Sequence, residues 1–209
     1  MDELNPDLLA LNNLFAYIID FDNHSNTVAI DKAHNIFLLG ALLSKKPKSL
    51  LEVGLGSGYT LHTMIQGIRH NLVGELTIVE NWYDWGGIRQ ENIFNDLTEK
   101  VTDLKITFLE QAERVFLDEC KSDQYDFILT DADHKNGGYL IDEYLRIAKE
   151  DAFIFMHDTN YHHTGQKCMK YLEERLIELK LPHFMFTEST RPNERCEEGF
   201  TFIINRRMK

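Results

Sequence analysis

The chain has 209 residues, which favours a single domain whose core is large enough to need neither disulfides nor structural metals. Its 34 acidic and 22 basic residues give a formal net charge of −12, which argues against a nucleic-acid partner because phosphate binding needs a surface rich in Lys and Arg. The 3 widely spaced cysteines imply neither a disulfide framework nor a zinc ribbon. Because the chain lacks a signal-peptide pattern and any apolar run near the roughly 20 residues that span a bilayer, we expect a cytoplasmic protein with no membrane partner.

Two segments before residue 48 carry apolar residues at helical spacing. The first covers residues 8–19 and the second covers 31–45, where Pro47 and the lysines beside it end the helix. We expect residues 1–46 to form a partial lid of two helices. The rest of the single domain, residues 47–209, is then the core that binds a ligand.

From residue 49 onward, short apolar runs alternate with helical patterns, as in βαβ units. The predicted strands cover residues 50–53, 75–79, 104–109, 125–130, 152–156, 184–187 and 200–204. The predicted helices cover residues 60–69, 112–120, 137–149 and 165–180, and residues 88–97 also show helix-like spacing. The last two strands leave no room for a helix between them and should be antiparallel. The sequence therefore predicts an α/β fold with a seven-stranded Rossmann-like sheet, mostly parallel with an antiparallel edge strand, and helices on both faces.

A glycine cluster at the end of the first predicted strand is the strongest functional feature. Gly54, Gly56 and Gly58 stand between this strand and the next helix, where glycines allow a tight turn and close approach of the backbone to a ligand. A nicotinamide-binding loop would need its third glycine at position 59, which is a tyrosine. The spacing favours a ligand that lies across the loop, with a carboxylate near the helix N-terminus. A turn without a ligand is the alternative.

An acidic residue, Glu80, ends the second predicted strand. At this place in a Rossmann-like sheet, an acidic side chain commonly accepts hydrogen bonds from ribose hydroxyls. Asn81 and Trp82 follow it and could flank an adenine ring. An exposed glutamate at a strand end is common, so this prediction depends on the glycine loop before it.

These residues carry a resemblance to a known family. The segment Glu52-x-Gly54-x-x-x-Gly58-Tyr59-Thr60 resembles the first motif of class I S-adenosylmethionine-dependent methyltransferases, and its Gly-Tyr-Thr ending is similar to the catechol and caffeoyl-CoA O-methyltransferase branch. Residues 108–112, 131–134 and 157–160 resemble later segments of that family. The resemblance implies methyl transfer from S-adenosylmethionine to a hydroxylated small molecule. The cofactor-binding residues it implies are Glu52, Gly54, Gly56, Gly58, Tyr59, Thr60, Glu80, Asn81, Trp82, Gln111, Ala112, Asp131 and Asp133.

The resemblance also implies a divalent cation such as Mg²⁺, held by Asp131 and Asp158. Thr159 replaces the asparagine that is the family's third ligand, and His157 stands before the pair. Histidine is a softer ligand and would suit Mn, Fe or Zn. The implied metal ligands are Asp131, His157, Asp158 and Thr159. A metal-independent N- or O-methyltransferase is the alternative, with the aspartates contacting the cofactor ammonium or solvent.

The family's catalytic lysine falls at His134, with Lys135 beside it. An imidazole accepts a proton near neutral pH without a large shift of its pKa, whereas the pKa of a lysine must be depressed. We therefore expect His134 to be the general base, with Lys135 as its competitor and a helix-capping histidine as the alternative. An aromatic or sugar acceptor is indicated by Trp82, Tyr83, Trp85 and Tyr161, and a homodimer is a further expectation. An NAD-dependent oxidoreductase and a non-catalytic nucleotide-binding module are the alternatives of other classes.

Overall fold

The computed structural model describes residues 32–71, 74–81, 84–85, 88–99, 101–133, 135–160, 165–186 and 199–206. The predicted helix over residues 8–19 lies outside these ranges, as does most of the expected lid. Within them, no helix is long and apolar enough to cross a membrane.

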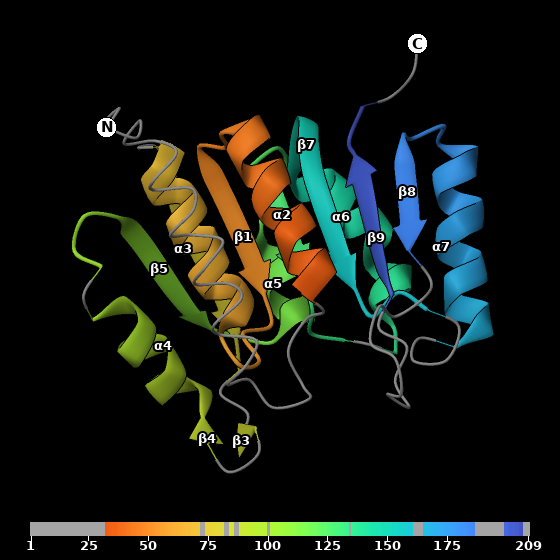
Figure 1. Ribbon diagram of the computed structural model, residues 1–209. Helices are drawn as coiled ribbons and strands as arrows, with labels where there is room; N and C mark the ends of the chain where they lie inside the picture. The colour runs from red at the N-terminus through yellow and green to blue at the C-terminus, as the bar shows by residue number, and fades with distance from the viewer. Residues whose placement is uncertain are drawn as a thin grey trace, which may run out of the picture.

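The described residues form a seven-stranded sheet in the order β5-β2-β1-β6-β7-β9-β8 (Figure 1). Its strands are β1 (Ser49–Val53), β2 (Glu75–Glu80), β5 (Lys105–Glu110), β6 (Tyr125–Thr130), β7 (Ala148–His157), β8 (His183–Phe186) and β9 (Phe200–Ile204). The pairs among β5, β2, β1, β6 and β7 are parallel, whereas β9 is antiparallel to both β7 and β8. The predicted fold class is confirmed, and the reversed strand β9 lies one place inside the edge.

Helices cover both faces of the sheet because the central strands are apolar on both sides. They are α2 (Lys32–Lys45), α3 (Tyr59–Asn71), α4 (Gln90–Thr98), α5 (Glu113–Glu119), α6 (Ile141–Ile147) and α7 (Gln166–Glu178). Leu51 and Ile128 are buried in one core cluster, with residues of α5, α6 and α7. Leu50, Phe127 and Leu129 are buried in the other, with residues of α2 and α3. Figure 1 shows α2 and α3 in front of the sheet and α5 and α6 behind it.

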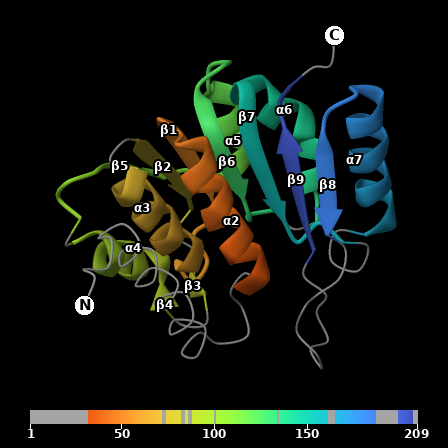
Figure 2. The same ribbon diagram turned by 45° about the horizontal axis from the view of Figure 1, so that its top comes forward.

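The helices α2 and α3 pack side by side and run in the same direction (Figure 2). Near their C-terminal ends, Nδ2 of Asn71 donates a hydrogen bond to the carbonyl oxygen of Leu42 at 2.9 Å. Gly67 allows this close packing, since a Cβ there would lie 3.2 Å from the Leu42 side chain. Because α3 starts just after β1, both helices begin at the edge where the parallel strands end.

Two predicted segments differ from the structure. The helix expected over residues 137–149 is a short 3₁₀ turn, η1 (Gly137–Leu140), followed by α6, and β7 begins at Ala148 instead of residue 152. Pairing of Ala148 with Tyr125, and hydrogen bonds from Nδ2 of Asn205 to the carbonyls of Ala148 and Lys149, extend the strand against the local pattern. A small hairpin, β3 (Asp84–Trp85) and β4 (Ile88–Arg89), precedes α4 and was not predicted.

Candidate active site

The glycine loop after β1 joins the ends of three strands. The backbone N–H of Gly54 donates to the carbonyl of Val79 at 3.0 Å, and the N–H of Asp131 donates to the carbonyl of Val53 at 2.8 Å. Gly54 has a φ of +89°, and a Cβ there would lie 2.6 Å from the carbonyl oxygen of Asp131. This glycine therefore allows the loop to pack directly on the end of β6.

Gly56 lies two residues further along the same loop and has a different environment. Its φ is +50°, and a Cβ at this position would meet no atom within 4 Å. The third glycine of the motif, Gly58, instead packs against the side chains of Ile93 and Leu97 on α4. Of the three predicted cofactor-binding glycines, Gly56 is thus the one with open space beside it.

The carboxylate of Glu80 faces the loop from the end of β2. Its Oε2 accepts a hydrogen bond from the N–H of Leu55 at 2.8 Å, and its Oε1 accepts one from the N–H of Asn81 at 2.8 Å. The Glu80 residue is only 8 % exposed. Each carboxylate oxygen can accept two hydrogen bonds, so the group can hold the loop and bind ligand hydroxyls together.

The next strand along the sheet brings Gln111 and Ala112 to the same edge. The N–H of Gln111 donates to the carbonyl of Glu80 at 3.0 Å, which fixes the end of β5 beside the end of β2. The side chain of Gln111 donates to Glu119, and Ala112 is the exposed residue that precedes α5. Trp82 lies outside the described residues, as does the neighbouring Tyr83.

Three predicted cofactor-binding side chains lie beneath the loop instead of on its surface. Glu52 is fully buried and accepts a hydrogen bond from the Thr60 hydroxyl, which joins β1 to the first turn of α3. Burial raises the pKa of Glu52 to about 8, with smaller upward contributions from the carboxylates of Asp131 and Glu80, against the opposing effect of the Thr60 hydrogen bond. Tyr59 is also buried, at 2 % exposure.

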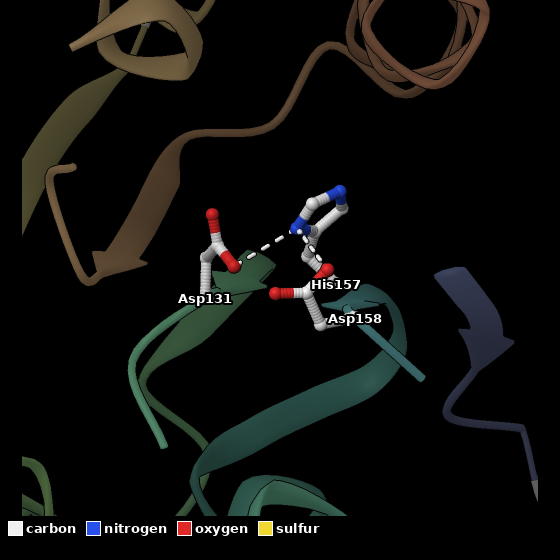
Figure 3. Close-up of side chains that lie close together, drawn as sticks. All are labelled: Asp131, His157 and Asp158. Carbon is white, nitrogen blue, oxygen red and sulfur yellow. Dashed lines mark hydrogen bonds and ion pairs between the residues drawn. The ribbon is translucent and has the colours of Figure 1, made fainter. Parts of the chain in front are cut away.

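Three potential metal ligands meet at the ends of β6 and β7 (Figure 3). Nδ1 of His157 lies 2.9 Å from Oδ1 of Asp131 and 3.5 Å from Oδ1 of Asp158. Among the described His, Cys, Asp and Glu residues, these three have ligand atoms that all lie within 4.8 Å of one another. Asp158 has a φ of +53°, an uncommon backbone conformation of the kind that clusters at functional sites. The structure thus brings together three of the four predicted ligands.

The fourth predicted ligand, Thr159, uses its hydroxyl in contacts within the fold. Its Oγ1 accepts a hydrogen bond from the Thr201 hydroxyl at 2.7 Å and donates one to the carbonyl of Met156 at 3.3 Å. Thr159 nevertheless lines a small cavity beside Asp131 and Asp133. The cavity is bordered by Thr130, Asp131, Ala132, Asp133, Gly137, Gly138, Met156, His157 and Thr159.

The loop after β6 carries the expected acid–base residues. Asp133 accepts hydrogen bonds from the N–H groups of Lys135 and Asn136, at 3.3 Å and 3.1 Å, and so stabilises the turn that leads into η1. Lys135 is exposed. His134 lies outside the described residues, so its role as a base stays a prediction.

A histidine that the sequence analysis did not select also lies at this site. His34, in the first turn of α2, is 3 % exposed. Its ring centroid is 6.0 Å from that of His157 and 4.6 Å from that of Phe200. No local signal distinguishes His34 from other helical residues, because its place depends on how α2 packs against β7 and β9.

A buried polar cluster lies below Asp131, at the end of β6. The Tyr144 hydroxyl donates to Glu113 and contacts the Thr130 hydroxyl at 2.8 Å. Burial raises the pKa of Glu113, and it raises the pKa of Tyr144 well above its usual range. The cluster ties α5 and α6 to the strand that carries Asp131.

The sequence matches a family described as a methyltransferase domain over residues 51–159, which includes the glycine loop, Glu80 and the three potential metal ligands. The chain belongs to this methyltransferase family. The prediction of a methyltransferase from the glycine motif is therefore confirmed. No curated protein matches the sequence.

Solved structures share the fold of this methyltransferase at low sequence identity. An O-methyltransferase from Bacillus cereus in complex with SAH is 13 % identical, with a TM-score of 0.65, over 92 % of this chain and 90 % of that one. The O-methyltransferase TomG from Streptomyces achromogenes, in complex with SAM, is 17 % identical with a TM-score of 0.66, over 93 % and 88 %. The SAH-bound methyltransferase PaMTH1 from Podospora anserina is 17 % identical with a TM-score of 0.61, over 96 % and 88 %.

Proposed function

We propose that the protein is an S-adenosylmethionine-dependent O-methyltransferase that acts on the hydroxyl of a small molecule. This proposal rests mainly on one observation. The glycine loop, Glu80 and the cluster of Asp131, His157 and Asp158 all lie at the same edge of the sheet. The similar structures solved with SAM or SAH support the cofactor, and the O-methyltransferases among them support an oxygen acceptor.

The glycine-loop end of this edge fits S-adenosylmethionine in shape and charge. Gly56 has open space beside it, and Glu80 can accept hydrogen bonds from ribose hydroxyls while it holds Leu55. Burial is the main cause of the raised pKa of Glu52, and the carboxylates of Asp131 and Glu80 add to it; these two carboxylates favour a cationic ligand beside them. Gln111 and Ala112 lie beside Glu80, and we assign them to the part of the site that contacts the adenine ring of the cofactor. When bound, the cofactor supplies a methyl group on a positively charged sulfur that an oxygen nucleophile can attack.

We further propose that Asp131, His157 and Asp158 hold a divalent cation. Ligand atoms about 2.1 Å from one ion lie about 3.0–3.4 Å apart in octahedral or tetrahedral geometry, close to the separations of His157 Nδ1 from the two carboxylates. The chemistry that such an ion supplies is the orientation and acidification of an acceptor hydroxyl. The imidazole favours Mn²⁺, Fe²⁺ or Zn²⁺ over Mg²⁺.

The loop after β6 is where we place the base. Asp133 holds the turn that contains Lys135, and the prediction for His134 places an imidazole beside it. A base here would take the proton from the acceptor hydroxyl. The backbone contact between Gly54 and Asp131 fixes the position of the glycine loop relative to the end of β6. Positioning of the nucleophile against the methyl carbon would then supply most of the rate.

The test is release of S-adenosylhomocysteine from S-adenosylmethionine over a panel of catechols, phenols and sugars, in EDTA and with added Mn²⁺ or Mg²⁺. We expect EDTA to abolish turnover, Mn²⁺ to restore it, and Asp158→Ala to lose it. Asp118→Ala, at an exposed aspartate on α5, is the control. Full activity in EDTA would support the metal-independent methyltransferase, and binding without turnover over the panel would support a binding module.

A further inference from the structure

Asn35, in the first turn of α2, has a side chain whose hydrogen-bonding groups have no partner among the described residues. The residue is 0 % exposed, and both Nδ2 and Oδ1 of its amide are buried without a hydrogen bond. Burial of an unsatisfied donor and an unsatisfied acceptor costs stability. Leucine would fill a similar volume without that cost, so the amide needs an explanation in terms of function.

The direction of Asn35 follows from its place on the helix. Leu38 and Leu42 lie three and seven residues further on, and hence on the same face of α2. Both leucines pack in the core cluster that includes Leu61 and Met64 of α3. His34, the residue before Asn35, instead contacts the rings of β7 and β9 residues described above. Asn35 therefore faces α3.

Its level along α3 follows from the packing of the two helices. Leu42 contacts Gly67, and α2 and α3 run in the same direction with their first turns at the same edge of the sheet (Figure 2). Asn35 lies seven residues before Leu42 on α2, and Thr60 lies seven residues before Gly67 on α3. Asn35 is therefore at the level of Thr60, in the first turn of α3. The glycine loop, with the open space beside Gly56, comes immediately before this turn.

The amino-acid group of S-adenosylmethionine has hydrogen-bonding needs that match this amide. Its carboxylate accepts hydrogen bonds and its ammonium donates them, while an asparagine offers a donor and an acceptor together. The neighbouring carboxylates cannot donate to the cofactor carboxylate when they are ionised. Glu80 ends β2 on one side of β1 and β6 lies on the other side, so a cofactor that lies across the loop with its ribose at Glu80 has its amino-acid group toward β6. The helix α2 begins on that side, since its His34 lies beside His157 of β7.

We propose that Asn35 binds the amino-acid end of the cofactor, with Nδ2 donating to the carboxylate and Oδ1 accepting from the ammonium. This inference rests on the proposed function, since it assumes that S-adenosylmethionine is the cofactor. It gives the first turn of α2 a role in cofactor binding that is separate from any role of the metal ligands.

The test compares two ligands by isothermal titration calorimetry on the whole chain. S-Adenosylhomocysteine carries the amino-acid group, and 5′-methylthioadenosine has the same nucleoside and sulfur but lacks that group. We expect Asn35→Leu to weaken binding of S-adenosylhomocysteine by about 10- to 100-fold and to leave 5′-methylthioadenosine within about twofold. The melting temperature of Asn35→Leu should equal or exceed that of the wild type, because an unsatisfied buried amide is removed.

Asn71→Leu is the matched control, because Asn71 lies at the other end of the same helix pair and its amide donates to Leu42. It should lower the melting temperature and leave both affinities unchanged. Asn35→Ala provides a second test if leucine does not fit, with the same selective loss expected. A lower melting temperature for Asn35→Leu with unchanged binding of S-adenosylhomocysteine would overturn the inference, as would equal losses for the two ligands. Failure of the wild type to bind S-adenosylhomocysteine would instead overturn the proposed function.

Discussion

Replacement of Gly54 by alanine should destabilise the protein far more than the same replacement at Gly56, two residues along the loop. At Gly54 a Cβ would lie 2.6 Å and 2.7 Å from the carbonyl oxygen and carbon of Asp131, which are backbone atoms that cannot rotate away. At Gly56 a Cβ would meet nothing within 4 Å. Both residues have positive φ values, so the difference between the two variants isolates the packing contact.

The expected magnitudes follow from these two environments. A non-glycine residue in a left-handed conformation costs about 1–2 kcal/mol, and overpacking adds about 1–3 kcal/mol. Gly54→Ala should therefore lower the free energy of unfolding by about 2–5 kcal/mol, and Gly56→Ala by about 1–2 kcal/mol. Urea denaturation of the three proteins measures both values.

The two variants should also differ in cofactor binding. The methyl group of Gly56→Ala would enter the space that we assign to S-adenosylmethionine, so we expect this folded variant to bind S-adenosylhomocysteine about tenfold or more weakly in calorimetry. Equal losses of stability in the two variants would refute the packing argument. Wild-type affinity in Gly56→Ala would show that the open side of the loop is not the cofactor side.

Three further predictions follow from side chains at the same edge. Burial raises the pKa of Glu52 from 4.5 to about 8, so the folded state holds a proton that the unfolded chain releases, and unfolding free energy should fall as pH rises from 5 to 8. In urea titrations over this range, the unfolding free energy of Glu52→Gln should fall less than that of the wild type. Parallel plots of unfolding free energy against pH for the two proteins would contradict the raised pKa. Thr60→Val should lower stability by about 1–3 kcal/mol, because it removes the hydrogen bond to buried Glu52; wild-type urea stability would argue against this bond. Thr159→Val should keep the Mn²⁺ affinity measured by calorimetry, whereas Asp158→Ala should lose it; a tenfold loss in Thr159→Val would restore Thr159 as a ligand.

The parts of the site that follow a strand could be predicted because the signal is local. An apolar run that ends in glycines defines the loop at Gly54, and an acid at the end of the next strand defines Glu80. Parallel strands bring such ends to one edge, so Asp131 and Asp158 could be placed together before their separation was known. The same reasoning gave the fold class, since it needs only the alternation of strands and helices.

Other features depend on contacts between distant segments. The Thr159 hydroxyl points to Thr201, 42 residues further on, and nothing near Thr159 in the sequence indicates this. The early start of β7 depends on pairing with Tyr125 and on hydrogen bonds from Asn205. Asn35 follows the helical spacing of its neighbours, and only the packing of α2 on α3 shows that its amide is buried.

Calorimetric titration of the wild-type protein with S-adenosylhomocysteine and with NAD, beside Glu80→Gln, tests the central claim most directly. The variant keeps an oxygen for the N–H of Leu55 but loses the charge and part of the acceptor capacity offered to ribose hydroxyls. We predict that S-adenosylhomocysteine binds the wild type, that NAD does not, and that Glu80→Gln weakens the binding by about 10- to 100-fold. Binding of NAD but not of S-adenosylhomocysteine, or wild-type affinity in Glu80→Gln, would contradict the account.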